Sequence, residues 1–139
     1  MSSIAAVRTL ARMSRLLERA CGDLSLAHYR VLAAVADGDE RASHVARRLA
    51  LGKPTVSASV EALCKRGLLV REDVAHDQRA ATLRLTPAGE AVLRGAEDAM
   101  TSHLEAVLER TPRSAEVVPA LTRMGTGLDR LVAERLAAR

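Results

Sequence analysis

The chain has 139 residues, of which 48% are hydrophobic and 27% charged, the balance of a globular domain and not of a disordered chain. Its longest apolar run, Val31 to Ala36, is too short to span a membrane, and two cysteines exclude a disulfide framework. The net charge of +4, carried mostly by arginine, is compatible with a nucleic-acid partner, and the absence of a secretory signal indicates a cytoplasmic protein.

The N-terminal part of the chain predicts three helices. Apolar residues recur at three-to-four spacing over residues 4–20, with arginines on the other sides, which predicts an amphipathic helix. The first 17 residues are rich in arginine and free of acids, which also resembles a transit peptide, but we interpret them as part of this folded helix. A second helix is expected from the N-cap Ser25 through Asp37, with Gly38 as its stop, and a short third helix over residues 42–50.

A fourth helix is predicted from Pro54 to about Arg66, because proline suits the first helical position and Gly67 ends the pattern. Three apolar residues share one face of this helix: Val56, Val60 and Leu63. The opposite face is small or polar and therefore free to contact a partner.

The periodicity then changes to that of strands. Residues 68–72 and 81–85 alternate or are β-branched, which predicts an antiparallel hairpin with a polar, charged tip. Thr86-Pro87 begins a long helix to about Arg110, and Thr111-Pro112 repeats the same start pattern. Helical spacing returns from Leu121, after a stretch in which proline and glycine interrupt the pattern.

This order of elements predicts a mainly α fold with a small β-hairpin wing, that is, a winged helix-turn-helix core. In such a core the second helix of the helix-turn-helix enters the major groove of DNA. The order of elements alone is equally compatible with a helical bundle that has no nucleic-acid role.

Three segments, considered together, resemble the MarR (multiple antibiotic resistance regulator) family of transcription regulators. They are LSLAHYRVLAAVADG at 24–38, ASHVARRLALGKPTVSASVEALCKRGLLVRE at 42–72 and DQRAATLRLTPAGE at 77–90. The last contains Asp-x-Arg followed by Leu-Thr-x-x-Gly, which marks the wing and the start of the next helix in that family. The resemblance implies an N-terminal dimerisation helix at 1–22, a DNA-binding domain at 23–88 and C-terminal dimerisation helices at 89–139.

The resemblance also implies a set of DNA-binding residues. Arg79 would enter the minor groove from the wing and Asp77 would orient it, while Ser43 would contact phosphate. The groove-facing start of the recognition helix would present Lys53, Pro54, Thr55, Ser57 and Ala58. Because Ala58 and Ala62 stand where many relatives carry arginine, base readout would rest on hydroxyl and methyl contacts.

The composition of the core favours a homodimer. The chain has no Phe or Trp and a single tyrosine, Tyr29, so its core is built from Leu, Val and Ala. Small side chains bury little area each, and a monomer of this size gains by sharing a core with a second copy. The expected function is a repressor that binds a pseudo-palindromic DNA duplex and is released by a small-molecule effector.

Parts of the sequence are also compatible with other functions. Cys21, beside Arg19, and Cys64, at the edge of a buried face, are candidate redox sensors, although each also fits as a small apolar residue. The four histidines show no metal-ligand spacing, and no enzyme motif, metal site or cofactor site is expected. A winged-helix module that binds another protein is the competing class.

Overall fold

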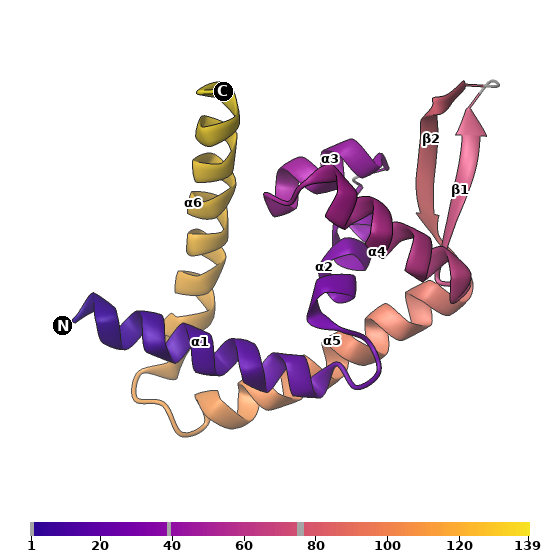
Figure 1. The fold of residues 1–139 in the computed structure, drawn as a ribbon. Helices are drawn as coiled ribbons and strands as arrows, with labels where there is room; N and C mark the ends of the chain where they lie inside the picture. The colour runs from indigo at the N-terminus through magenta and orange to yellow at the C-terminus, as the bar shows by residue number, and fades with distance from the viewer. Residues whose placement is uncertain (1, 39, 75–76) are drawn as a thin grey trace.

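The computed structural model describes residues 2–38, 40–74 and 77–139, and for residues 73, 74 and 77–80 it describes the backbone only. These residues form a mainly helical fold with one two-stranded antiparallel hairpin (Figure 1). The elements are α1 Ser3–Ala20, α2 Leu26–Ala36, α3 Ala42–Leu49, α4 Lys53–Lys65, β1 Leu69–Val74, β2 Asp77–Leu85, α5 Pro87–Leu108, the short 3-10 helix η1 Ser114–Glu116, and α6 Val117–Ala137. The expected fold class is confirmed.

The helix boundaries lie at the capping residues that the sequence predicts. The Ser25 hydroxyl accepts a hydrogen bond from the His28 backbone N–H, at 3.1 Å, and so caps α2. Gly38 and Gly67, just beyond α2 and α4, have positive φ angles of 108° and 72°. Glycine adopts this backbone conformation without the steric cost that a Cβ would add, so both helices end where expected.

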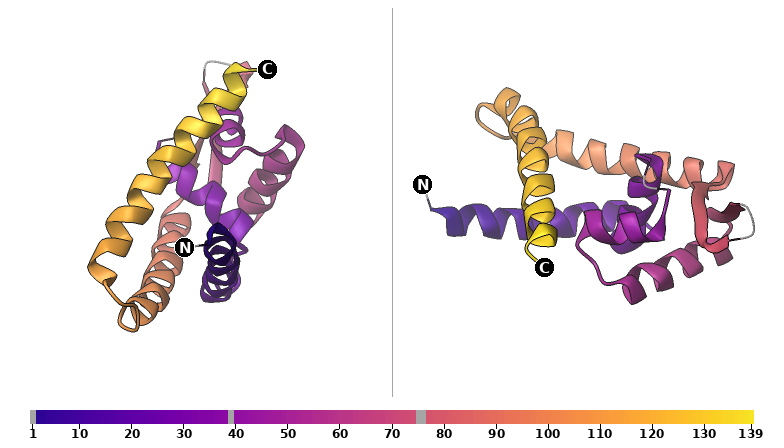
Figure 2. Two further views of the ribbon diagram at one scale, coloured as in Figure 1. Left: turned by 90° about the vertical axis from the view of Figure 1, so that its left-hand side faces the viewer. Right: turned by 90° about the horizontal axis from the view of Figure 1, so that it is seen from above.

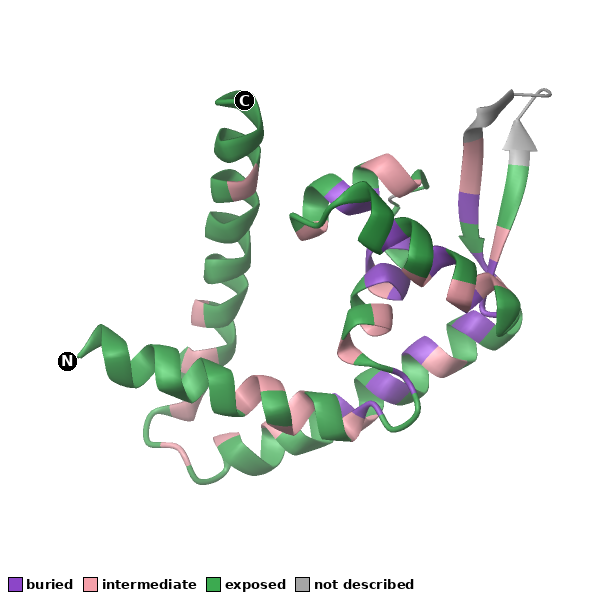
Figure 3. Ribbon diagram, viewed as in Figure 1, coloured by how far each residue is buried: buried purple, intermediate pink, exposed green. Residues whose placement is uncertain are grey.

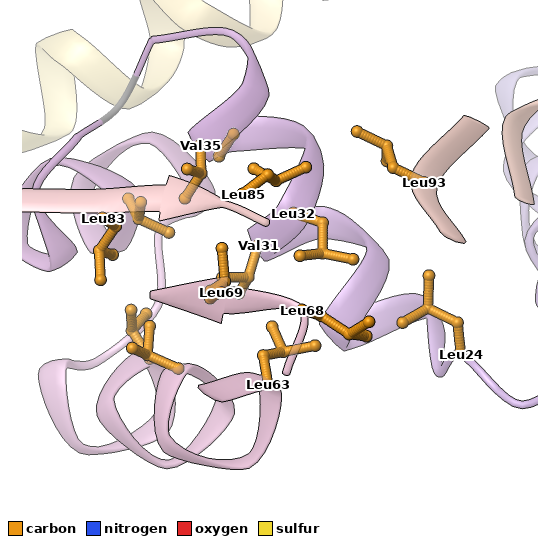
Figure 4. Packing of buried hydrophobic residues seen from close by; sticks show 14 of the residues in the cluster. Leu24, Val31, Leu32, Val35, Leu63, Leu68, Leu69, Leu83, Leu85 and Leu93 are labelled. Atoms are coloured by element: carbon orange, nitrogen blue, oxygen red, sulfur yellow. The ribbon is translucent and has the colours of Figure 1, made fainter. Parts of the chain in front are cut away.

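The core lies between the helix-turn-helix, the base of the hairpin and the first half of α5 (Figures 3 and 4). Its fully buried side chains are aliphatic: Leu32, Leu63, Val31, Val45, Val56 and Val60. The predicted inner face of α4 is therefore confirmed. Leu83 and Leu85 of β2 pack onto this core, and the Leu83 N–H donates to the Glu40 carbonyl, which ties the hairpin to the loop after α2.

One tightly packed junction joins the wing to α5. The Thr86 hydroxyl donates to the Gly67 carbonyl at 2.6 Å and accepts from the Gly89 N–H at 3.0 Å. The Thr86 N–H donates to the Leu68 carbonyl at 3.1 Å. Gly89 packs so closely on Leu68 that a Cβ there would lie 2.9 Å from the Leu68 carbonyl carbon and closer still to its oxygen. The Leu-Thr-x-x-Gly motif thus has a structural role.

The two strands are longer than the alternating pattern suggests. Pairing runs from Leu69–Leu85 to Val74–Asp77, with an irregularity between Glu72 and Val74. The ladder depends on backbone hydrogen bonds, so it continues through charged positions that have no apolar face to bury. The predicted charged tip is therefore largely strand.

The last helix also differs from its prediction. Thr111-Pro112 does not start a helix, because the Thr111 hydroxyl bonds back to the Val107 carbonyl at 2.7 Å, at the end of α5. Instead α6 begins at Val117 and continues past Gly125 and Gly127. Pro119 is its third residue, where the N–H that proline lacks has no partner within the helix.

The terminal helices extend beyond the core and keep large apolar side chains exposed. α1 lies along α5, whereas α6 turns back beside α3 and stands away from α5 over most of its length (Figures 1 and 2). On α1, Ile4 and Val7 are each 63% exposed, and on α6 Met124 and Leu128 are 56% and 59% exposed. No helix within the described ranges has the length and apolar character needed to cross a membrane.

Candidate nucleic-acid interface

The outer face of α4 presents the residues expected to read DNA. Pro54, Thr55, Ser57 and Ala58 are all exposed, while Val56 between them is buried against the core. This alternation follows from the helical period, because the side chains opposite a buried stripe face the solvent. The face offers hydroxyl and methyl groups and no arginine.

The N-terminus of α4 is open to an anion. Its N-cap, Gly52, is extended and supplies no side-chain cap, and Lys53 at the first helical position is exposed. The first N–H groups of a helix and the positive end of its dipole attract phosphate. The arrangement suits a contact with a DNA backbone.

The turn between α3 and α4 depends on an unusual residue. Ala50, the C-cap of α3, has φ 53° and ψ 40°, the left-handed region that favours glycine. The Leu51 N–H donates to the Ala46 carbonyl at 2.9 Å and closes the turn. Ala50 was not among the predicted site residues, because an alanine carries no pattern that indicates this conformation.

Ser43 is the second residue of α3 and is half-buried. The helix has Arg41 as its N-cap and no side-chain capping bond, so its first N–H groups are also open. Ser43 and Lys53 both line a cavity of about 600 Å³ that α6 closes on its other side. The structure therefore brings these two predicted residues to one place.

The predicted wing residues belong to β2, where Asp77 pairs with Val74 through the backbone. The side chains of Asp77 and Arg79 lie outside the described part of the structure, so their predicted roles stay predictions. Nearer the base of the wing, an exposed ion pair joins Arg84 of β2 to Glu72 of β1. It connects the two strands below the tip.

The two cysteines differ in environment. Cys21 is only 7% exposed, and its Sγ lies 3.6 Å from Met100 Sδ of α5. Burial, and then the nearby charge of Glu18, raise the pKa of the Cys21 thiol. The hypothesis that Arg19 stabilises an accessible thiolate there is therefore wrong. Cys64 is half-buried, at the edge of the inner face of α4 as expected.

A polar contact of the half-buried Tyr29 joins α2 to α5. The Tyr29 hydroxyl donates to Glu97 Oε1 at 3.2 Å. Burial, and then the charge and hydrogen bond of Glu97, raise the pKa of Tyr29 to about 12. Among the described residues, no group of three or more His, Cys, Asp or Glu side chains is arranged to hold a metal ion. His76 lies outside the described residues.

The sequence matches a known family model, and the fold is similar to several solved structures. The MarR family model matches residues 22–80. The transcriptional repressor CouR, in a structure bound to a 23-mer DNA duplex, is 25% identical over 91% of each chain, with a TM-score of 0.77. Wild-type MarR from E. coli, in its apo form, is 15% identical over 89% of this chain and 96% of that chain, with a TM-score of 0.74.

Staphylococcus aureus MarR, in complex with salicylate and kanamycin, is 18% identical over 94% of this chain and 87% of that chain, with a TM-score of 0.73. No curated protein sequence matches the chain. The resemblance that the motifs suggested is confirmed: the chain has the fold of a MarR-family winged helix-turn-helix transcription regulator.

Proposed function

We propose that the protein is a sequence-specific, double-stranded-DNA-binding repressor that acts as a homodimer. The observation that carries the proposal is the outer face of α4, which leaves Thr55, Ser57 and the open helix N-terminus free over a fully buried inner face. The DNA duplex in the CouR structure supports the same use of the fold. The net charge of +4 favours association with DNA.

The homodimer is proposed from the unpartnered apolar faces of the terminal helices. Leucine, valine, isoleucine and methionine side chains on α1 and α6 remain 40–63% exposed in the single chain: Ile4, Val7, Leu10, Val118, Leu121, Met124, Leu128, Leu131 and Leu136. Apolar surface of this kind on a terminal helix usually marks an interface. A two-fold dimer would place two copies of α4 about 34–36 Å apart, one turn of DNA.

The release of DNA by a small ligand is part of the proposal. Salicylate in the S. aureus MarR structure supports a binding site for small molecules in this fold. A ligand releases DNA only through different affinities for the DNA-bound and free states, and tenfold release needs about 1.4 kcal/mol. The alternative of a cysteine sensor is less well supported, because burial protects the Cys21 thiol.

The test is the binding of the DNA that flanks the protein's own gene, measured by gel shift and by fluorescence anisotropy over a salt series. Arg79→Ala should weaken binding. It should also reduce the slope of log K against log salt concentration by about one for each lost contact, or by about two in a dimer. Thr55→Val should change the preference among sequences more than the overall affinity.

The control is Arg110→Ala, which removes the same charge from a position just past α5, where Arg110 pairs with Glu109 and with the Ala106 carbonyl. It should leave DNA binding unchanged. If wild-type protein binds no duplex while remaining folded, the DNA-binding proposal is wrong. A winged-helix module that binds another protein would then be the better interpretation.

A further inference from the structure

The helix-turn-helix is basic except at one position. Residues 42–65 contain four Lys and Arg residues and a single acid, Glu61. A carboxylate on a surface that faces phosphates repels them, and so lowers the affinity for every DNA sequence. Charge alone therefore disfavours an acid on this surface, and Glu61 calls for a contact of its own.

Glu61 belongs to the outer stripe of α4. Pro54, Ser57, Ala58 and Glu61 follow one another at i, i+3, i+4 and i+7, and all four are exposed. With 3.6 residues per turn, this stripe lies roughly opposite the three buried residues of the helix. The recognition helix of a homeodomain reads base edges from residues at the same spacing. Glu61 thus occupies the last reading position of the stripe.

Glu61 is also the side chain of this stripe that best discriminates between base pairs. Pro54 and Ala58 offer apolar contacts, and the Ser57 hydroxyl can donate or accept and so suits any base. An ionised carboxylate only accepts, and its partner in the major groove is the N4 amino group of cytosine. Adenine N6 also donates, but the N7 acceptor beside it repels a carboxylate.

The Glu61 carboxylate is positioned on the surface and remains accessible. Its Oε1 lies 3.4 Å from Nζ of Lys65, one turn further along α4, and the Glu61 side chain is 67% exposed. An exposed pair of this kind contributes little to stability, so folding does not explain the acid. The pair engages Oε1, which leaves Oε2 to accept from a base, and Lys65 offsets part of the repulsion from nearby phosphates.

We propose that Glu61 is a specificity-determining residue that accepts a hydrogen bond from cytosine N4 in the major groove. This assignment rests on the proposed DNA-binding function and names a base that it selects. Glu61 also lines a hollow between α4 and β1 with Cys64 and Arg71, so the cytosine should lie on the side of each half-site nearer the wing. The same carboxylate weakens binding to other sequences, and a repulsive element of this kind raises specificity.

The first test selects duplexes from a library with a randomised central region, using the full chain. Wild type should enrich one cytosine position in each half-site. Glu61→Gln should move the preference there toward adenine, because an amide pairs with both N6 and N7 of that base. Glu61→Ala should accept all four bases at that position and bind non-cognate DNA more tightly. The matched control, Glu18→Gln, removes a carboxylate from another exposed helical ion pair, with Arg15 of α1, and should keep the cytosine.

The second test changes the DNA and not the protein. N4-methylcytosine still pairs with guanine, but its methyl group replaces the N–H that faces the major groove. Placed at the selected position, it should lower the affinity of wild type about tenfold or more, and it should leave the affinity of Glu61→Ala unchanged.

Three results would contradict the assignment. A selected site that neither Glu61→Gln nor Glu61→Ala alters would overturn the role of Glu61, and would leave it as a surface partner of Lys65. Equal binding of the cytosine and N4-methylcytosine duplexes by wild type would overturn it as well. If folded wild type enriches no duplex at all, the proposed function itself is refuted, and this assignment with it.

Discussion

Gly89→Ala should destabilise the protein, although alanine is the better helix former. A Cβ at position 89 would lie 2.9 Å from the Leu68 carbonyl carbon and 3.3 Å from Leu68 Cα. Carbon atoms in good contact stand about 3.5–4.0 Å apart, so α5 and the start of β1 must separate by a few tenths of an ångström or more. Backbone atoms cannot yield as a flexible side chain would.

The magnitude follows from two opposing terms. Overpacking by a methyl group costs about 1–3 kcal/mol, and the gain in helix propensity returns about 0.8–1.0 kcal/mol. The difference is a net loss of about 0–2 kcal/mol, and a loss of about 1 kcal/mol lowers Tm by about 4 °C in a domain of this size. Separation of the junction should also weaken the Thr86 bond to Gly67, which is 2.6 Å long in the native structure.

The matched control is Gly95→Ala, on the same helix, because a Cβ there meets nothing within 4 Å. It should stabilise the protein by up to about 1 kcal/mol. Both variants are compared with wild type by thermal unfolding at one protein concentration, since the Tm of a dimer depends on concentration. If both variants raise Tm equally, the close approach of Gly89 to Leu68 is refuted.

Three further outcomes are expected. Tyr29 is the chain's one tyrosine, so absorbance at 295 nm should show its ionisation with a midpoint near pH 12, and Glu97→Gln should lower this midpoint. Because folding raises the pKa of Tyr29, its contribution to the free energy of unfolding is fully present below about pH 10, the unfolded pKa, and is lost as the pH rises toward 12. Leu128→Arg should shift the light-scattering mass from a dimer toward 14.9 kDa, and a wild-type mass of 14.9 kDa at micromolar concentration would contradict the dimer. Cys64 should react with a thiol reagent before Cys21 in folded protein, and faster reaction of Cys21 would contradict its burial.

Local patterns in the sequence were sufficient to predict the helix-turn-helix and the caps around it. The buried stripe of Val56, Val60 and Leu63 follows from helical periodicity, and Ser25 and Thr86 act on backbone groups three residues away. These features depend on neighbours in the chain. A single sequence therefore contains the information that specifies them.

Features that depend on distant residues could not be predicted in this way. The position of Cys21 beside Arg19 suggested an accessible thiolate, but its environment is set by Met100, 79 residues further along the chain. Likewise, Arg47 and Arg135 come together only because α6 turns back toward α3. Periodicity indicates which face of a helix is apolar and not which helix will cover it.

The junction at Thr86 and Gly89 has a mechanical consequence. It fixes the base of the wing to the first turn of α5, a continuous helix of 22 residues and thus a rod of about 33 Å. A tilt of about 5° at the far end of such a lever moves the wing and α4 by about 3 Å, close to the axial rise of about 3.4 Å per phosphate of one DNA strand. In the proposed dimer, a small repacking between subunits at the far end of α5 would therefore move the DNA-binding face by about the axial rise of one base pair, because α5 is continuous over its 22 residues.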